Sequence, residues 1–260
     1  MRKHLFAALL AAATLASCKK DKVENNGNGN ENPGPVTPTT KLLKKITETT
    51  DGNVTVYNLT YNNNKQLTSV RAADNSDITT FTYNGNGDVT KVESIDNESH
   101  NVYEYVYENG IPERATFKSY EINGGAETLV QDDILHYEVE GGKVTKINMD
   151  MILQQQEINF VLTYDGTGNL TKIQTDGSTA YTAEFTYGNK KPILPKVFKY
   201  VMDQAGYSVN FFAKNELISQ RYDFPGTDND SEHSTQYTYD ANGYALTSND
   251  GTTQIAFEYQ

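Results

Sequence analysis

Residues able to carry out catalysis are few in this chain of 260 residues, and they are scattered. There is one cysteine, Cys18, and the four histidines are His4, His100, His136 and His233. No two histidines have the HExxH spacing of a zinc site. No GxSxG motif marks a nucleophilic serine. We therefore predict that the protein is not an enzyme and that it has no catalytic residue and no cofactor. The histidines are interpreted as ordinary strand or loop residues.

Carboxylates supply two weaker candidates. Two carboxylates that meet in space can hydrolyse a glycoside, and Asp132-Asp133 is the sole acidic pair. A loop between hairpins is the simpler interpretation of that pair. Asp228, Asp230 and Glu232 stand at alternate positions and can wrap a hard cation such as Ca²⁺. They lack the Gly and the distant Glu of an EF-hand loop, so a solvated loop is favoured.

Cys18 closes a segment that has the form of an export signal. Two basic residues precede an apolar run from Leu5 to Leu15, which is too short to remain as a membrane-spanning helix. The tetrad Leu15-Ala16-Ser17-Cys18 resembles the bacterial lipobox. The resemblance implies cleavage before Cys18 and attachment of diacylglyceryl and acyl chains, such as palmitate, at that residue. We therefore predict a signal peptide over 1–17 and lipidation of Cys18.

Residues 18–40 are predicted to be the lipid anchor and a disordered linker, because Asn, Gly, Pro and Thr dominate them. The start Cys18-Lys19-Lys20-Asp21-Lys22 is similar to that of Bacteroidetes lipoproteins. That resemblance implies an outer-membrane location facing the cell surface, with the periplasmic face left open. The net charge of −12 becomes −14 once Arg2 and Lys3 are removed, and such a chain is repelled by nucleic acid.

Residues 41–260 repeat one hairpin unit, which predicts a single β domain. Each unit is an alternating strand ending in Tyr, a turn rich in Asn, Asp and Gly, and a strand of the type Val/Leu-Thr-Lys-Val/Ile. Clear copies start at Tyr61, Tyr83, Tyr137, Tyr164 and Tyr239, and degenerate copies start at Tyr107 and Tyr187. The alternation places aromatic side chains on one sheet face, and core packing is the favoured role of the tyrosines.

The spacing of apolar residues after each turn predicts an irregularity. Val89 and Val92 are three apart, as are Leu170 and Ile173, so a regular strand would turn them to opposite faces. Either a β-bulge lies between them or both faces are partly covered. Counting the periodic segments gives roughly 14–18 strands and no helix. Such an antiparallel meander must curl into a strongly coiled or barrel-like sheet.

The unit YDGTGNLTKI resembles the YD repeat of Rhs and teneurin-type proteins. Positions that match that repeat well are Tyr164, Asp165, Gly168, Asn169 and Leu170, and positions that match less well are Tyr239, Asp240, Gly243 and Leu246. The whole chain looks like small Bacteroidetes lipoproteins of a domain-of-unknown-function family described as porin-like. That resemblance covers residues 41–260. It implies no activity and no functional residue.

Three functions remain in view. The favoured one is a non-enzymatic binding or structural module, anchored in the membrane through the lipid on Cys18, with a glycan or another outer-membrane protein as its further partner class. The second is a lipoprotein that binds a glycan or small ligand in a Tyr-lined concavity. The third is a porin-like membrane barrel. The alternating runs, mostly five to seven residues, argue against the third because a spanning strand needs roughly 9–11.

Overall fold

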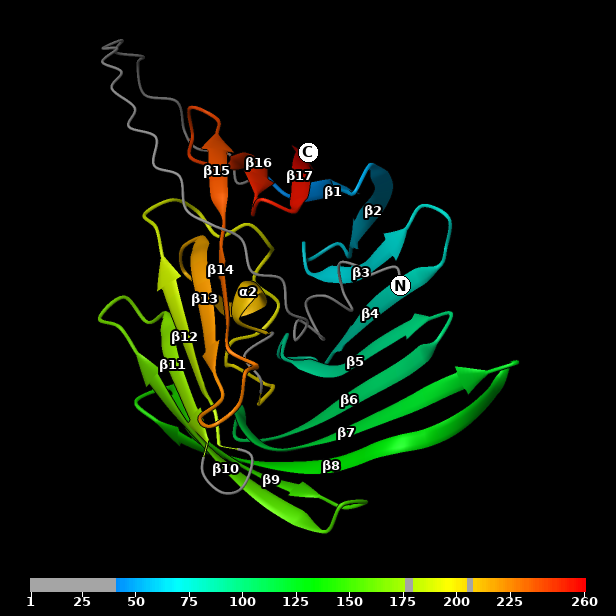
Figure 1. Ribbon diagram of the computed structural model, residues 1–260, viewed down its shortest axis with the longest axis vertical. Helices are drawn as coiled ribbons and strands as arrows, with labels where there is room; N and C mark the ends of the chain where they lie inside the picture. Colours follow the sequence, from blue (N-terminus) through cyan, green and yellow to red (C-terminus); the bar gives the residue numbers. More distant parts are fainter. Residues whose placement is uncertain (1–40, 176–179, 205–207) are drawn as a thin grey trace.

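The computed structural model describes residues 41–175, 180–204 and 208–260, and it shows an all-β chain (Figure 1). Seventeen strands form one antiparallel sheet, and the helix of the described region, α2 (Val209–Phe212), has four residues. The predicted all-β meander of 14–18 strands is confirmed. In the described part of the chain, no helix is long and apolar enough to cross a bilayer. The strands are β1 (Leu43–Thr50), β2 (Asn53–Tyr61), β3 (Leu67–Ala72), β4 (Asp77–Tyr83), β5 (Val89–Asp96), β6 (Ser99–Glu108), β7 (Ile111–Asn123), β8 (Ala126–Glu140), β9 (Lys143–Met151), β10 (Gln156–Tyr164), β11 (Leu170–Thr175), β12 (Thr182–Tyr187), β13 (Leu217–Asp223), β14 (Ser231–Ser234), β15 (Gln236–Tyr239), β16 (Ala245–Asn249) and β17 (Thr253–Tyr259).

The sheet curls into a nearly closed barrel. Apart from β14 and β15, each strand pairs with the next, and β1 pairs with both β2 and β17. β14 and β15 follow one path around Thr235, with β14 pairing to β13 and β15 to β16. The N–H of Thr235 itself donates to the carbonyl of Ile218 at 2.8 Å. Curling in this way leaves almost no unpaired strand edge.

The barrel interior is apolar because alternate side chains of each strand point inward. In β10, Phe160 and Leu162 are buried between exposed neighbours. In β6, Tyr103 and Tyr105 are buried in the same pattern. The Tyr103 ring stacks on Phe117 of β7 with 4.3 Å between ring centroids. The predicted gathering of aromatic side chains on one sheet face is confirmed.

Four hairpin turns share one conformation, and each begins with Asn or Asp directly after a tyrosine. In the turn after Tyr164, the Asp165 carboxylate accepts the N–H groups of Thr167, Gly168 and Asn169 at 2.9, 2.7 and 2.9 Å. This is the Asx-turn arrangement, in which a side chain replaces a backbone acceptor. The side chains that accept backbone N–H groups in the same way in the other three turns are those of Asn62, Asn84 and Asp240.

Asp165 gives the protein an acid-sensitive contribution to stability. Partial burial raises the pKa of its carboxyl, but the hydrogen bonds from Thr167, Asn169 and Gly168 outweigh burial and lower the pKa from 3.8 to about 2. A lowered native pKa stabilises the fold above pH 3.8, and that contribution is lost as pH falls toward 2. We expect Asp165→Asn to keep the turn, since asparagine fills the same position at residues 62 and 84.

Urea unfolding followed by circular dichroism checks this expectation. The stability difference between wild type and Asp165→Asn should shrink as pH falls from about 5 to 2. Asp228→Asn, at an exposed position, serves as the control. A difference between wild type and Asp165→Asn that stays constant over this pH range would contradict the assignment.

Each of these turns is followed by a β-bulge. The ladder pairs Thr60 with Ser69 and Tyr61 with Leu67, so Thr68 is the extra residue. Its hydroxyl donates to the carbonyl of Thr60 at 3.2 Å. Leu67 and Val70 are therefore both buried although they are three apart, as are Leu170 and Ile173, so the structure has the bulge, one of the two predicted alternatives. The same shift of register follows the turns at Tyr83, Tyr164 and Tyr239.

Lys65 occupies a position that the other three turns give to glycine. Its φ is +61°, where Gly87, Gly168 and Gly243 have +83°, +92° and +77°. A side chain in this left-handed region costs roughly 1 kcal/mol. We expect Lys65→Gly to raise the free energy of unfolding by about 0.5–1 kcal/mol, partly offset by the entropy of the unfolded chain.

Equilibrium denaturation of a matched pair tests this point. Gly87→Ala should destabilise the protein, whereas Gly85→Ala in the same turn should not, because Gly85 has no positive φ and open space around it. Equal effects at the two glycines would show that φ is not the cause.

Tyrosine hydroxyls tie successive hairpins together at one end of the barrel. The hydroxyl of Tyr83 donates to the carbonyl of Leu67 at 2.6 Å, and that of Tyr187 to Leu170 at 2.6 Å. Burial raises the pKa of Tyr83 to about 12. We call the end that carries these tyrosines and turns the closed end. Further bonds of this type join Tyr61 to Leu43, Tyr107 to Val89, Tyr164 to Val144 and Tyr237 to Leu217.

Removing one such hydroxyl should cost the net value of a hydrogen bond. We expect Tyr187→Phe to lower the free energy of unfolding by about 1 kcal/mol. Tyr259→Phe is the matched control, because the buried Tyr259 hydroxyl has no hydrogen-bond partner in the part of the chain described. Comparable losses in the two variants, measured by urea denaturation, would refute this role for the hydroxyls.

Two expectations about the strands are wrong. Six strands have nine or more residues, and β7 and β8 reach 13 and 15, so strand length does not argue against a membrane barrel. The apolar periodicity of β7 and β8 is interrupted by polar residues, which hides their length. The pair Asp132-Asp133 lies within β8 and not in a loop.

Candidate functional site

Between β12 and β13, the described residues 188–204 and 208–216 leave the sheet and fill the barrel; we call them the plug. The degenerate hairpin predicted to start at Tyr187 is therefore wrong. Its two prolines, Pro192 and Pro195, cannot donate to a strand ladder. Figure 1 shows α2 of the plug inside the curve of the strands. Its buried side chains are Leu194, Val197, Phe198, Tyr200, Val201, Met202, Asp203, Ser208, Val209, Phe211, Phe212, Ala213 and Glu216.

The plug begins and ends at a neck in the closed end. The N–H of Gly188 donates to the carbonyl of Glu216 at 3.0 Å. The carboxylate of Glu216 is 2% exposed, and it accepts the N–H of Lys190 at 2.6 Å and the hydroxyl of Tyr239 at 3.0 Å. A Cβ at position 188 would lie 2.0 Å from this carboxylate, so a larger residue there would displace it from these bonds. The neck therefore holds both ends of the plug at the barrel rim.

Aromatic contacts hold the plug against several strands of the wall. The Phe211 ring lies 5.7 Å from Phe81 of β4, measured between centroids, and Phe212 lies 6.2 Å from Tyr164 of β10. The hydroxyl of Tyr137 on β8 donates to the carbonyl of Met202. Contacts with three separated strands place the plug inside the lumen.

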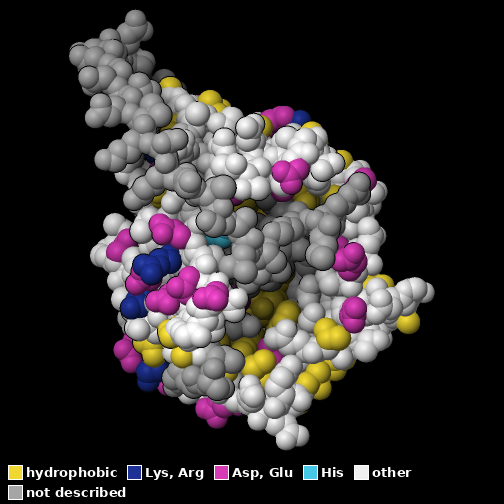
Figure 2. Space-filling view, viewed as in Figure 1, with side chains coloured by type: hydrophobic (Ala, Val, Ile, Leu, Met, Phe, Trp, Pro, Cys, Tyr) yellow, Lys and Arg dark blue, Asp and Glu magenta, His cyan; other side chains and the backbone are white. Residues whose placement is uncertain are grey.

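A small hollow remains between the plug and the wall. It has a volume of about 140 Å³, and its lining includes Leu194 and Asn210 of the plug with Tyr237, Asp250 and Phe257 of the wall. Drug-sized ligands occupy pockets of about 300–1,000 Å³. This pocket is suited to no more than a very small ligand. On the face shown in Figure 2, hydrophobic side chains gather in a hollowed middle, and acidic side chains are spread around it.

The acidic pair of β8 cannot act on one bond. Adjacent strand residues point to opposite faces, and Asp133 is fully buried whereas Asp132 is half-buried. Gln131 donates to the Asp133 carboxylate at 2.6 Å. Burial, opposed by that hydrogen bond, raises the pKa of Asp133, with a smaller contribution from Asp132. This geometry does not match the facing carboxylates of a glycosidase.

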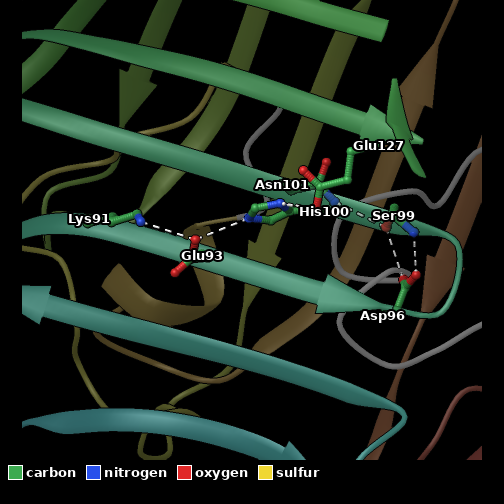
Figure 3. Close-up of polar contacts among 7 residues, drawn as sticks. All are labelled: Lys91, Glu93, Asp96, Ser99, His100, Asn101 and Glu127. Carbon is green, nitrogen blue, oxygen red and sulfur yellow. Dashed lines mark hydrogen bonds and ion pairs between the residues drawn. The ribbon is translucent and has the colours of Figure 1, made fainter. Parts of the chain in front are cut away.

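His100 is at the centre of a polar cluster on the outer wall (Figure 3). Its Nε2 lies 3.1 Å from Glu93 of β5, and its Nδ1 lies 2.9 Å from Glu127 of β8. The ring stacks on Tyr120 at 5.5 Å. Burial raises the pKa of Glu93, but hydrogen bonds from Lys91 and His100 outweigh it and lower the pKa. With both ring nitrogens engaged by carboxylates, the cluster stabilises the wall and offers no free base.

The predicted site residues are not brought together. Asp228, Asp230 and Glu232 are exposed around the start of β14, and Asp230 accepts the N–H of Phe224 at 2.8 Å. Within 41–175, 180–204 and 208–260, no three His, Cys, Asp or Glu side chains form a group able to hold a metal ion. His136 lies 3.9 Å from Asp150, and His233 is a β14 residue. Cys18 and the predicted segments 1–17 and 18–40 lie outside the described residues.

Comparison with known proteins identifies a similar fold. A porin-like protein from Bacteroides vulgatus has 12% sequence identity, a TM-score of 0.55, and an alignment covering 85% of this chain and 99% of that one. The two proteins share a fold. Two TcdB2-TccC3 structures align over 74% and 79% of this chain but over 10% of theirs, with TM-scores of 0.27 and 0.28 and identities of 15% and 14%. No protein-family model and no curated protein sequence matches the chain.

Sequence analysis missed the plug and its neck. Two signals mark the plug in retrospect: the paired prolines and the loss of strand alternation from Ile193 to Asp203. The role of Glu216 has no local signal, because Gly188 and Tyr239, its partners, are distant in sequence. The feature that distinguishes this barrel is therefore the plug in its lumen.

Proposed function

We propose that this chain is a lipid-anchored outer-membrane protein whose barrel is a non-enzymatic binding or structural module, facing the cell surface. The observation that carries the proposal is the plug, which fills the lumen with the chain's own apolar side chains. A lumen filled in this way favours a binding or structural role over a channel or a catalytic cleft. The lipobox around Cys18 supports the anchor.

The outer wall supports a barrel that stands in water. Lys146 of β9 lies 3.0 Å from Glu138 of β8, and Lys172 of β11 lies 3.8 Å from Glu184 of β12. A lysine facing lipid at the bilayer midplane costs about 2–4 kcal/mol. Charges that recur along adjacent strands therefore favour a tethered barrel over an embedded one.

The porin-like membrane barrel is the alternative that the description of the Bacteroides vulgatus protein favours. Conductance across a planar bilayer tests it on the full chain. Our proposal expects no discrete conductance steps, because the plug occupies the lumen. Steps that disappear when the protein is heat-denatured would favour the porin-like alternative.

The glycan-binding alternative has less support. The tyrosine hydroxyls at the closed end donate to backbone carbonyls, so they do not line a free concavity. A glycan array probed with the lipidated protein in detergent tests this function. We expect no retained glycan. Retention that is lost in Tyr237→Ala, a substitution in the lining of the hollow, would favour the alternative.

A further inference from the structure

Lysines gather at the closed end of an otherwise acidic chain. The plug contains five lysines and two acidic residues, so its net charge is +3 in a chain of net charge −12. Both acids, Asp203 and Glu216, are buried. Four of the five plug lysines are exposed. We define the lysine face as these five with two neighbours: Lys41, Lys143, Lys190, Lys191, Lys196, Lys199 and Lys214.

One half of the lysine face lies beside the turn at Gly168. The Cε atoms of Lys143 and Lys214 lie 3.9 and 3.8 Å from the position that a Cβ of Gly168 would occupy. Burial and the nearby ammonium groups of Lys214 and Lys199 lower the pKa of Lys196. Lys143 and Lys214, 71 positions apart in sequence, therefore bring like charges together beside this turn.

The other half lies beside the turn that starts at Asp240. The Nζ atoms of Lys41 and Lys191 lie 5.4 and 3.7 Å from the centroid of the Tyr244 ring. Lys190 lies 6.0 Å from the Tyr239 ring. Among the described residues, Lys41 alone of the seven has a carboxylate within 4.0 Å, that of Asp240 at 2.6 Å. The ammonium groups of the other six lysines thus have no carboxylate within that distance in the described part of the chain.

The chain reaches the barrel at this same face. The N–H of Lys41 donates to the hydroxyl of Tyr244 at 3.1 Å, which fixes the point where the preceding residues leave. Residues 18–40 can span at most about 80 Å when fully extended. A lipid on Cys18, which the proposed function requires, would therefore keep the lysine face within that distance of the bilayer.

We propose that the lysine face docks onto the surface of a bilayer with anionic lipid headgroups, the membrane that would hold the Cys18 lipid. Lysines near a surface of anionic headgroups are attracted to it, and several small contributions add up. The tether supplies a high local concentration, so weak individual contacts suffice. Docking would turn the opposite end of the barrel, and the β7–β8 hairpin, away from the membrane.

Lysine labelling of the intact lipidated protein in vesicles tests the proposal. In vesicles with about 30% phosphatidylglycerol, labelling of Lys190, Lys196, Lys199 and Lys214 should fall at least fivefold relative to pure phosphatidylcholine. Lys146 and Lys172 of the wall should be unchanged. The protection should disappear in about 0.5 M NaCl, where charges are screened within a few ångströms. Equal labelling in both vesicles would overturn the proposal.

Variants separate charge from other causes of protection. Replacing the four exposed plug lysines by glutamine should restore labelling of Lys41 and Lys143 on anionic vesicles. Lys146→Gln with Lys172→Gln is the matched control and should not. Protection by dextran sulfate without protection on anionic vesicles would overturn a bilayer as the partner. Failure of the proposed anchor would be detected separately. Mass spectrometry would show Cys18 without lipid, and the protein would not float with neutral vesicles.

Discussion

Cys18→Ser is expected to abolish lipid attachment and to remove the protein from the outer-membrane fraction. The thiol is the nucleophile that the lipobox resemblance requires, and a hydroxyl does not replace it at neutral pH. Several acyl chains give stable anchoring where one is marginal, so loss of all of them leaves no lipid anchor. Metabolic labelling with palmitate, followed by fractionation of membranes, measures both effects.

A matched substitution one residue earlier controls for damage to export. Ser17→Ala keeps a small residue before the cysteine, and we expect it to be labelled and located like the wild type. The intact mass of the Cys18→Ser variant should correspond to a chain that still carries residues 1–17, because cleavage before position 18 does not occur. Palmitate label or outer-membrane location that persists in Cys18→Ser would contradict the anchor.

Phe211→Ala is expected to be the most destabilising single change in the barrel. Its ring is buried and contacts Phe81 of the wall and Phe198 within the plug, the latter at 6.4 Å between centroids. Truncating a buried phenylalanine removes its transfer free energy and leaves a cavity, at about 3–5 kcal/mol. Urea denaturation monitored by near-UV and far-UV circular dichroism measures this loss.

An exposed apolar residue provides the comparison. Leu153, in the turn between β9 and β10, is 49% exposed, and Leu153→Ala should change stability by less than about 0.5 kcal/mol. A loss below about 1 kcal/mol for Phe211→Ala would show that the plug does not pack in the lumen in solution.

The repeated hairpin could be predicted from sequence because its determinants are local. Tyr164 ends a strand, Asp165 and Gly168 supply the turn, and an apolar pair three apart requires the bulge. These features need only a dozen neighbouring residues. The number of strands and the curling of the sheet follow from repeating them.

The plug could not be predicted because its structure depends on the lumen. The sequence of the plug shows no strand or helix periodicity, and the plug's described residues are held by contacts with Phe81, Tyr137 and Tyr164 on separate strands. The lysine face has the same origin. Lys143 and Lys214 are neighbours only because the plug returns to the β10–β11 turn, where the N–H of Lys214 donates to the Asn169 side chain at 2.7 Å.

The central claim is that a plugged barrel stands in water and is anchored to the membrane by the lipid on Cys18, with no strand embedded in the bilayer. Tryptic cleavage of the membrane-bound protein at Lys19, Lys20 or Lys22, in about 0.5 M NaCl to screen the lysine face, tests it most directly. We predict that the barrel is released into the supernatant without detergent, as a folded β protein. A folded barrel that stays in the membrane pellet and is extracted only by detergent would contradict the account.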